Sequence, residues 1–235
     1  MASQGRPNDV SRVPLSRERV IDAAIRLADE GGIESLTMRR LAQALGVEAM
    51  SLYYYVASKD EIVNGIVDVV VSEFRLGLPG ADWKGALRTT ATSAYEVLVR
   101  HPWAASLVLS ATGVSPARLR YMNSILGTLR EAGFSADMTD HGYHALESHI
   151  MGFTLWEVGM DLGSHDDLAV LATAFLEELP ADEFPYVAEH VHQHLKERNP
   201  DDEGEFAFGL DLILDGLERI LLTESPSLPR RAVDS

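Results

Sequence analysis

Apolar residues recur at helical spacing along almost the whole chain. In one early segment they stand at Val20, Ala24, Leu27 and Ala28, which is the i, i+4, i+7, i+8 pattern of a helix with one buried face. No run of comparable strength alternates between apolar and polar residues, as a half-buried strand would. The chain has 235 residues, of which 46% are hydrophobic, so it can bury a sizeable core. This pattern predicts an all-α fold.

Capping residues and glycines divide the pattern into separate helices. Ser16, Thr37 and Ser58 are placed to cap helix starts, and Glu61 follows Ser58 at capping-box spacing. Gly46 is expected to end the second helix. We expect helices over residues 16–31, 37–45, 48–55, 58–74, 83–99, 103–111, 116–132, 138–162, 168–179, 186–198 and 206–222.

The predicted domain boundary is the segment Leu76–Gly80, because its sequence LGLPG ends the helical pattern with glycine and proline. Residues 16–75 are expected to form a small helical domain that ends in a long linking helix, after a flexible arm at 1–15. Residues 76–222 are expected to form a larger helical domain, and residues 223–235 a disordered tail.

Charge is distributed unevenly along the chain. The formal net charge is −16, from 20 Lys and Arg against 36 Asp and Glu. Residues 1–75 carry 9 basic and 11 acidic side chains, whereas residues 76–235 carry 11 and 25. A nearly neutral domain can bind DNA if its cations gather on one face, so the first domain remains a candidate for DNA binding. The acidic remainder is expected to face away from the phosphates.

The N-terminal segment and the residue composition indicate a cytoplasmic protein. Residues 1–15 are polar and lack the apolar core of a signal peptide, and no run approaches 18 apolar residues. The chain has no cysteine, so disulfides and thiolate metal sites are excluded.

The two short helices on either side of Gly46, braced by the helix before them, fit a helix-turn-helix. An ordinary three-helix bundle is the alternative. Arg39 and Arg40 stand in the first turn of the second helix, where cations oppose the helix dipole. A bundle gains nothing from this placement, whereas a helix end directed at phosphate does.

The third short helix has an unusual outer surface. Leu52 and Val56 can point inward, since they are four residues apart. The residues left facing outward are Met50, Ser51, Tyr54 and Tyr55. Contact with thymine methyl groups, sugars and phosphates would account for exposed apolar side chains there. Lys59, at the start of the next helix, is placed to meet phosphate as well.

Residues 15–74 resemble the DNA-binding domain of the TetR family of repressors. The most specific part is TMRRLAQALGVEAMSLYYYVASKDEI, residues 37–62. Three later segments are similar to core-domain helices of the tetracycline-repressor branch, namely YMNSILGTLREAGFS (121–135), MGFTLWEVG (151–159) and FAFGLDLILDGLERIL (206–221). The resemblance is dense before residue 75 and patchy after it.

This resemblance implies a ligand-responsive repressor that binds a palindromic operator as a homodimer and is released by a small molecule. It implies an N-terminal helix-turn-helix domain joined by a long helix to a helical ligand-binding and dimerisation domain. A DNA-binding activator and a ligand-independent regulator remain open alternatives. An enzyme is a distant one, because the sequence has no Gly-rich phosphate loop, no Gly-x-Ser-x-Gly elbow and no His-Glu-x-x-His. No cofactor or metal is expected.

The resemblance also implies, by position, which residues contact DNA. The residues that would contact the DNA backbone or flanking bases are Thr37, Arg39 and Arg40. The residues that would face base edges are Glu48, Ala49, Met50 and Ser51. Those that would hold phosphates and sugars are Tyr53, Tyr54, Tyr55 and Lys59. Ala49 and Met50 replace polar or proline side chains of the tetracycline repressor, and Tyr55 replaces a histidine common in the family, so the operator is expected to differ.

Candidates for ligand binding follow in the second part of the chain. They are Phe74, Arg75, Trp103, Met122, His144, Glu147, Met151 and Trp156, together with Phe153 and Met160. Aromatic and methionine side chains make adaptable apolar linings, although most of these residues suit a core equally well. According to the resemblance, the tetracycline repressor holds its drug through two histidines. Segment 103–112 lacks the first and Arg75 replaces the second, so we expect a mainly apolar inducer and not magnesium-tetracycline.

The final helix carries an apolar stripe and two glycines seven residues apart, Gly209 and Gly216. The stripe consists of Phe206, Leu210, Ile213, Leu214, Leu217 and Leu221. The glycines would let a partner helix approach closely, and core packing within one subunit is the alternative. The resemblance favours a two-fold bundle with the helix at 138–162.

Two groups of histidines have several interpretations. His190 and His194 are spaced to share a metal, but His192 lies on the opposite side of the helix, so a solvated helix is favoured. His141, His144, Glu147 and His149 stand on one helix. His144 and Glu147 would either bind a ligand or be satisfied polar residues at a bundle interface.

Overall fold

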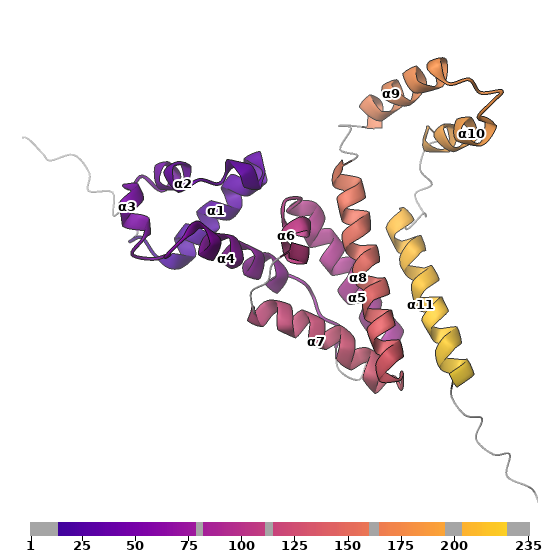
Figure 1. Cartoon of the computed structure of the whole chain (residues 1–235), viewed down its shortest axis with the longest axis horizontal. Helices are drawn as coiled ribbons and strands as arrows, with labels where there is room; N and C mark the ends of the chain where they lie inside the picture. The colour runs from indigo at the N-terminus through magenta and orange to yellow at the C-terminus, as the bar shows by residue number, and fades with distance from the viewer. Residues whose placement is uncertain (1–13, 79–81, 111–114, 160–164, 196–203, 225–235) are drawn as a thin grey trace, which may run out of the picture. The chain divides into compact units, whose positions relative to one another are not determined.

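The structure, a computed structural model, describes residues 14–78, 82–110, 115–159, 165–195 and 204–224, and within these ranges it is helical without a strand. Figure 1 labels the helices, which are α1 (Arg17–Gly31), α2 (Met38–Leu45), α3 (Ala49–Leu52), α4 (Lys59–Ser72), α5 (Trp83–Arg100), α6 (Ala104–Ser110), α7 (Pro116–Glu131), α8 (Ala136–Gly159), α9 (His165–Glu178), α10 (Pro185–His194) and α11 (Gly204–Glu224). A short 3₁₀ turn, Ile33–Ser35, joins α1 to α2. The predicted all-α fold is confirmed.

Contacts divide the chain into two compact units. The first unit contains the residues up to Glu73 together with Arg100–Arg120. The second contains Phe74–Val99 and the residues from Tyr121 onward. This division differs from a single boundary at Leu76–Gly80, because α6 packs against α4 and joins the first unit. The functional domains expected from the sequence stay a prediction.

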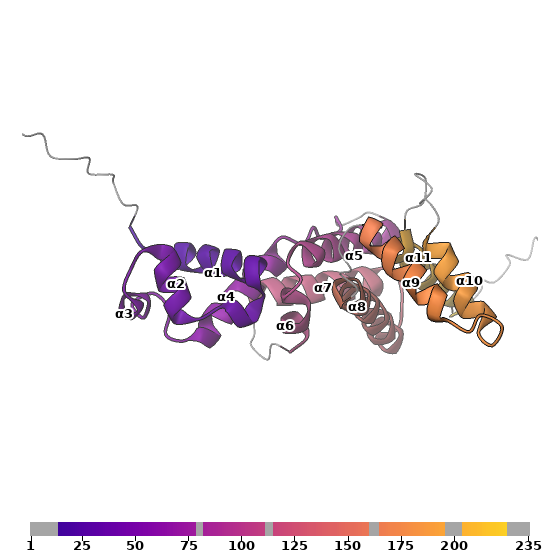
Figure 2. The same ribbon diagram turned by 90° about the horizontal axis from the view of Figure 1, so that it is seen from above.

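The first unit is built around α1, which packs against α2 and α4 (Figure 2). Val20 of α1 and Ile66 of α4 have no exposed surface, so their faces form the core of this unit. Ser16, Thr37 and Ser58 cap α1, α2 and α4, and each side chain accepts a hydrogen bond from the N–H three residues later. The three caps predicted from the sequence are confirmed.

Helix α3 is shorter than predicted. It ends at Leu52, and Tyr53–Tyr55 form a turn. The Tyr55 N–H bonds the Leu52 carbonyl, three residues back and at 2.9 Å, which is the tighter geometry of a helix end. Gly46, between α2 and α3, has φ +67° and makes the left-handed turn between the two helices. The expected helix at 48–55 was therefore too long, although the turn before it was placed correctly.

The segment after α4 is held along α5 in the second unit. Its backbone N–H groups at Arg75 and Gly77 donate to the buried hydroxyls of Ser93 (3.0 Å) and Thr90 (2.9 Å). A Cβ at position 77 would lie 2.5 Å from Cβ of Ala86 and 2.7 Å from its carbonyl oxygen. Only glycine allows this approach, so Gly77 contributes to packing as well as ending the helical pattern.

Helices α5, α8 and α11 meet in an aromatic cluster made of Tyr95, His149, Phe153 and Phe206. The Phe206 ring stacks on Tyr95 with 4.0 Å between centroids and on His149 with 4.8 Å. Phe153 packs edge-on against Tyr95 and Phe206. Nε2 of His149 lies 2.9 Å from the Phe206 carbonyl oxygen. Packing of α8 beside α11, visible in Figure 1, therefore relies on this cluster.

Gly209 on α11 serves the packing within one chain. A Cβ at this position would lie 2.5 Å from Cε1 of the His149 ring. Four residues of the predicted stripe are buried in the same unit, namely Phe206, Leu210, Leu214 and Leu217. The alternative of core packing within one subunit therefore holds for Gly209 and these four residues. Gly216 differs, because apart from its own stretch of helix no atom of the described residues comes within 4 Å of a Cβ built there.

Ion pairs also join α5 to α11. Nζ of Lys84 lies 2.6 Å from Asp215 Oδ1 and 2.8 Å from Glu218 Oε2, and these two acceptors raise the pKa of Lys84. One turn along, Arg88 pairs with Asp211. This row of ion pairs links successive turns of the two helices.

The helices α9 and α10 pack against each other. Exposed large apolar side chains on these helices are Val170, Leu171, Phe175, Tyr186 and Val187, and Phe184 is exposed at the cap position before α10.

Candidate DNA-binding and ligand-binding sites

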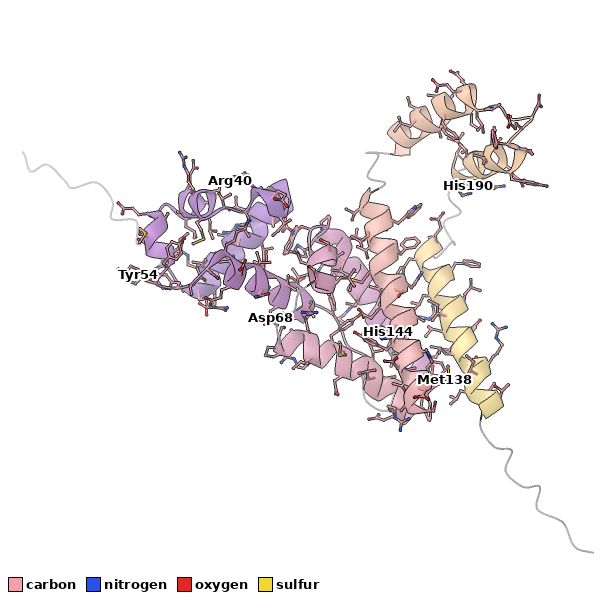
Figure 3. The ribbon with its side chains drawn as sticks, viewed as in Figure 1. Arg40, Tyr54, Asp68, Met138, His144 and His190 are labelled. Carbon is pink, nitrogen blue, oxygen red and sulfur yellow. The ribbon has the colours of Figure 1, made fainter. Side chains whose placement is uncertain are left out.

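The segment Glu48–Tyr55, which we call the reading segment, exposes large apolar side chains. The exposed fractions are 71% for Met50, 48% for Tyr53, 87% for Tyr54 and 38% for Tyr55. Figure 3 shows Tyr54 beside α3 in the first unit. The side chains of Leu52 and Val56 are buried in the core and hold the segment against it. A contiguous exposed apolar patch on a folded unit marks a contact surface.

Polar groups of the reading segment are few. Glu48 stands at the cap position of α3, but its carboxylate makes no capping hydrogen bond and the residue is exposed. Ala49 is exposed and Ser51 is half-buried. The surface thus presents a methionine, an alanine, three tyrosines and one carboxylate.

Basic residues precede and follow the reading segment in the sequence. Arg39 and Lys59 are exposed, and Lys59 is the first residue of α4. Arg40, labelled in Figure 3, is exposed too, but its NH1 donates to the Ser35 carbonyl at 3.3 Å. Thr37 is engaged as the cap of α2, since its Oγ1 accepts from the Arg40 N–H at 3.2 Å. Arg39 and Lys59 are therefore the better placed of these residues to meet phosphate.

The start of α4 is fixed by a variant of the expected capping box. Ser58 Oγ accepts from the Glu61 N–H at 3.1 Å, as predicted. Glu61 Oε2 accepts from the N–H of Ala57 at 2.6 Å, one residue before the predicted partner. This bond is the main cause that lowers the pKa of Glu61. It ties the residues between α3 and α4 to the helix and so positions Lys59.

In the second unit, Tyr121 brings two ligand-binding candidates together. Its buried hydroxyl donates to Glu147 Oε1 at 2.5 Å, and its ring packs edge-on against Phe74 at 5.1 Å. Burial raises the pKa of Tyr121 well above its usual value of 10.0, and the nearby Glu147 charge raises it further. Tyr121 thus stays a neutral donor to the half-buried carboxylate of Glu147.

Arg75 follows directly after Phe74 and is paired within the second unit. Its NH2 lies 3.1 Å from Glu96 Oε2, and its Nε lies 3.4 Å from Ser93 Oγ. The side chain is 68% exposed. Arg75 thus lies in the chain between α4 and α5 and contacts α5, and both of its expected roles stay predictions.

Two other candidates are buried. Trp103 belongs to the first unit, where its Nε1–H donates to Asp29 Oδ1 at 2.7 Å. The same Asp29 oxygen lies 2.8 Å from His101 Nδ1, so the indole is part of a polar contact between α1 and the segment before α6. Met151 is buried on α8. Both residues therefore contribute to packing.

The remaining candidates are exposed or lie outside the described residues. Met122 and Trp156 are both exposed, and the Trp156 ring is 5.5 Å from Phe153. His144, labelled in Figure 3, is exposed and lies 3.5 Å from Asp140 one turn earlier. Met160 lies outside the described residues.

Two family models match the chain. The model described as "Bacterial regulatory proteins, tetR family" matches residues 20–66, and the model "Tetracyclin repressor-like, C-terminal domain" matches residues 76–221. The chain belongs to the TetR family. The first match contains α2 and the reading segment, and the second runs from the segment beside α5 into α11.

Individual relatives agree with this assignment. The chain is 33% identical to the tetracycline repressor protein class D of Escherichia coli over 210 residues, which are 87% of this chain and 89% of that protein. A possible TetR family regulator from Streptomyces coelicolor has a TM-score of 0.71 at 29% identity, covering 87% of this chain and all of the other. ActR of Streptomyces coelicolor, solved in complex with (S)-DNPA, has a TM-score of 0.68 at 24% identity over 89% of this chain and all of ActR.

The protein is therefore a TetR-family transcriptional regulator with a helix-turn-helix DNA-binding domain, and not an enzyme. The fold and the family predicted from the sequence are confirmed. The roles of individual residues in contacting DNA or ligand stay predictions.

The histidines of the described residues stand in no metal-binding cluster. Within the ranges that the structure describes, no group of three or more His, Cys, Asp or Glu side chains could hold a metal ion. On α10, Nδ1 of His192 lies 2.6 Å from the Ala188 carbonyl oxygen, and Figure 3 labels His190 on the same helix. The side chain of His194 lies outside the described residues. Among the described helices, none combines the length and the apolar character needed to cross a membrane.

Sequence reasoning missed Asp68 in the TetR-family linking helix. Its Oδ1 accepts from the Ser115 hydroxyl and from the Ala117 N–H (3.2 Å), so α4 caps the start of α7 (Figure 3). Asp68 and Ser115 are 47 residues apart, and no local pattern marks such a pair. Tyr121 and Asp29 were missed for the same reason.

Proposed function

We propose that this TetR-family protein is a cytoplasmic repressor that binds a palindromic operator as a homodimer and is released by a small molecule. The observation that carries this proposal is the reading segment, whose exposed Met50 and Tyr54 stand in the sequence between the exposed cations Arg39 and Lys59. Operator DNA supplies partners for both kinds of side chain, because base edges and sugars offer apolar contact and phosphates offer negative charge.

Exposed apolar side chains on α8 and α11 support the homodimer. Leu155 and Trp156 are exposed on α8, and Phe208 and Leu212 are exposed on α11. Among the described residues, none from another helix packs against Gly216 of α11, so a helix of the partner subunit has room to approach there. A two-fold pairing of these helices would remove this apolar surface from water.

The DNA-binding part is tested by selection from a pool of duplexes with randomised sequence. Wild-type protein is expected to enrich an inverted repeat whose half-site centres lie about 10 bp or a little more apart, the spacing of successive major grooves. Phe208→Glu places a charge in the proposed dimer face and is expected to yield monomers that enrich no inverted repeat. Leu78→Glu, at an exposed apolar residue outside the helices, is the matched control. A wild-type protein that is monomeric at micromolar concentration and enriches no inverted repeat contradicts the proposal.

For the inducer, the surroundings of Phe74 and Tyr121 support a mainly apolar molecule with a polar group that reaches Glu147. Both rings are buried and in contact with each other, and the Tyr121 hydroxyl bonds the half-buried Glu147 carboxylate. The segment 103–112 has no histidine and an arginine stands at position 75, so the two imidazole nitrogens that the resemblance implies for a metal chelate are missing from these positions. One relative is named the tetracycline repressor, and ActR, which has this fold, was solved in complex with the small molecule (S)-DNPA.

Release requires the ligand to prefer the state of the protein that does not bind DNA. Each tenfold loss of operator affinity corresponds to about 1.4 kcal/mol of coupling. Calorimetry with tetracycline plus magnesium, beside a panel of apolar compounds, tests the ligand class. We expect tetracycline plus magnesium to give no heat of binding. We expect an apolar compound to bind and to release the selected duplex. Tight tetracycline binding that releases the duplex contradicts the apolar-inducer proposal, and a lack of release by any compound favours a ligand-independent regulator.

A further inference from the structure

The side chains of the reading segment lack the groups that usually distinguish guanine and adenine. From Ala44 to Ser58 the sequence contains no Arg, Lys, Asn or Gln, and its one charged residue is Glu48. Guanine is most often read by Arg or Lys, and adenine by Asn or Gln, through paired hydrogen bonds in the major groove. The reading segment therefore has no side chain for either of these pairings.

What the segment does expose is apolar surface. Met50 is 71% exposed and Ala49 is exposed beside it, while Leu52 holds the segment against the core. In the major groove the thymine 5-methyl group is the base-edge feature that an apolar side chain recognises. Neighbouring Tyr53 and Tyr55 carry hydroxyls suited to the backbone, which leaves Ala49 and Met50 as the apolar side chains at the α3 surface.

The basic residues nearest in the sequence lie on other helices. Arg39 and Arg40 belong to α2, the helix that crosses the DNA backbone in a helix-turn-helix, and Lys59 begins α4. Their charges strengthen binding to any sequence, and the bases that face α3 itself are left to the side chains of α3. Glu48 adds to the selection, because a carboxylate accepts a hydrogen bond from the cytosine amino group and repels phosphate.

We propose that α3 reads its half-site chiefly through thymine 5-methyl groups contacted by Met50 and Ala49. This inference rests on the proposed function, since it names the base preference of the same surface. The half-site is expected to have thymines opposite Met50 and Ala49. We expect no guanine at these positions, because the reading segment has no Arg or Lys side chain to contact one.

The test starts from the inverted repeat that the wild-type protein enriches. Each thymine is replaced in both half-sites by 2′-deoxyuridine, which removes only the methyl group, and binding is measured by fluorescence anisotropy. Loss of one buried methyl group is expected to weaken binding about fourfold per half-site, from about 0.8 kcal/mol per buried carbon group. Two half-sites together give a loss of about tenfold or more at one or two thymine positions.

Variants of Met50 assign the effect to this residue. Met50→Ala is expected to lose the sensitivity to deoxyuridine at its position, whereas Met50→Leu, which keeps an apolar side chain, retains it. Met138→Ala, a methionine of α8 in the second unit, retains it too and serves as the control. Met50→Gln is expected to shift the selected base toward adenine.

Two results overturn the inference. If no deoxyuridine substitution weakens wild-type binding, or if Met50→Ala stays as sensitive as the wild type, thymine methyl groups are not what Met50 reads. A pool from which the wild-type protein enriches no sequence overturns the proposed function and this inference with it. If the wild-type protein enriches an inverted repeat but its binding is insensitive to deoxyuridine, the proposed function stands and only the inference fails. The two failures are therefore distinguishable.

Discussion

The reading segment of the first unit and the Tyr121–Glu147 pair of the second place their functional groups by different means. The reading segment consists of consecutive residues whose exposure is set by two buried anchors, Leu52 and Val56. Tyr121 and Glu147 come from α7 and α8 and meet only because these helices pack together. A surface made of neighbours in sequence can be predicted from a single helix, whereas a pair across two helices depends on tertiary structure.

The largest effect that separates the two regions is expected from Leu52→Ala. The Leu52 side chain has no exposed surface, and its truncation should lower the free energy of unfolding by about 2–5 kcal/mol. Leu146→Ala, at a buried leucine of α8, should cost a similar amount. Chemical denaturation measures both, and operator binding of the folded protein distinguishes them: only Leu52→Ala should lose affinity, because it releases the reading segment. Equal loss of operator affinity in both variants would remove the distinction between the regions.

A smaller effect is expected from Tyr121→Phe. The variant keeps the buried ring but leaves the Glu147 carboxylate without this donor, at a cost of about 1–3 kcal/mol in the free energy of unfolding. Tyr186→Phe, at an exposed tyrosine of α10, is the control and should have no measurable effect. If the two variants are equally stable, the Tyr121–Glu147 bond does not stabilise the fold.

The same tyrosine predicts a pH dependence. Burial and Glu147 raise the pKa of Tyr121 well above 10.0, so in the folded protein it keeps its proton where the unfolded chain loses it. Because the unfolded state then binds fewer protons, the free energy of unfolding falls as pH rises from about 10 toward the folded pKa, and the stabilisation is complete below that range. Urea denaturation between pH 8 and 11 should show this fall in the wild type and less of it in Tyr121→Phe. Identical alkaline slopes would contradict the burial of a neutral Tyr121.

The smallest predicted effect concerns the cations beside the reading segment. Arg39→Ala should lower the slope of log K against log salt concentration by about 0.9, the value for one lost phosphate contact. Arg40→Ala should lower it less, because Arg40 also donates to the Ser35 carbonyl in the folded protein. An unchanged slope for Arg39→Ala, measured by anisotropy on the selected duplex, would falsify its phosphate role.

Local signals made most of the helical architecture predictable. Side-chain caps at Ser16, Thr37 and Ser58 and the left-handed turn at Gly46 act within a few residues, so the sequence shows them directly. The length of α3 was overestimated, because its apolar spacing continues through a turn that the sequence pattern does not distinguish from a helix.

Contacts between distant residues could not be predicted. Asp68 caps α7 from α4, and Gly209 makes room for the ring of His149, although its spacing from Gly216 suggested a partner helix. Both depend on which helices become neighbours. The ligand-binding candidates share this dependence. Tyr121 joins Phe74 to Glu147, and the Phe153 ring lies beside Trp156.

We expect one short exposed segment of the first unit to recognise the operator, independently of the polar pair in the second unit. The most direct measurement compares operator affinity and melting temperature for Tyr54→Ala and Tyr121→Phe. Tyr54 is 87% exposed, so Tyr54→Ala should melt like the wild type and bind the selected inverted repeat about tenfold or more weakly, a loss of about 1.4 kcal/mol or more. Tyr121→Phe should melt at a lower temperature and, while folded, bind the repeat as the wild type does. Wild-type affinity in Tyr54→Ala together with a large loss of affinity in folded Tyr121→Phe would contradict the account.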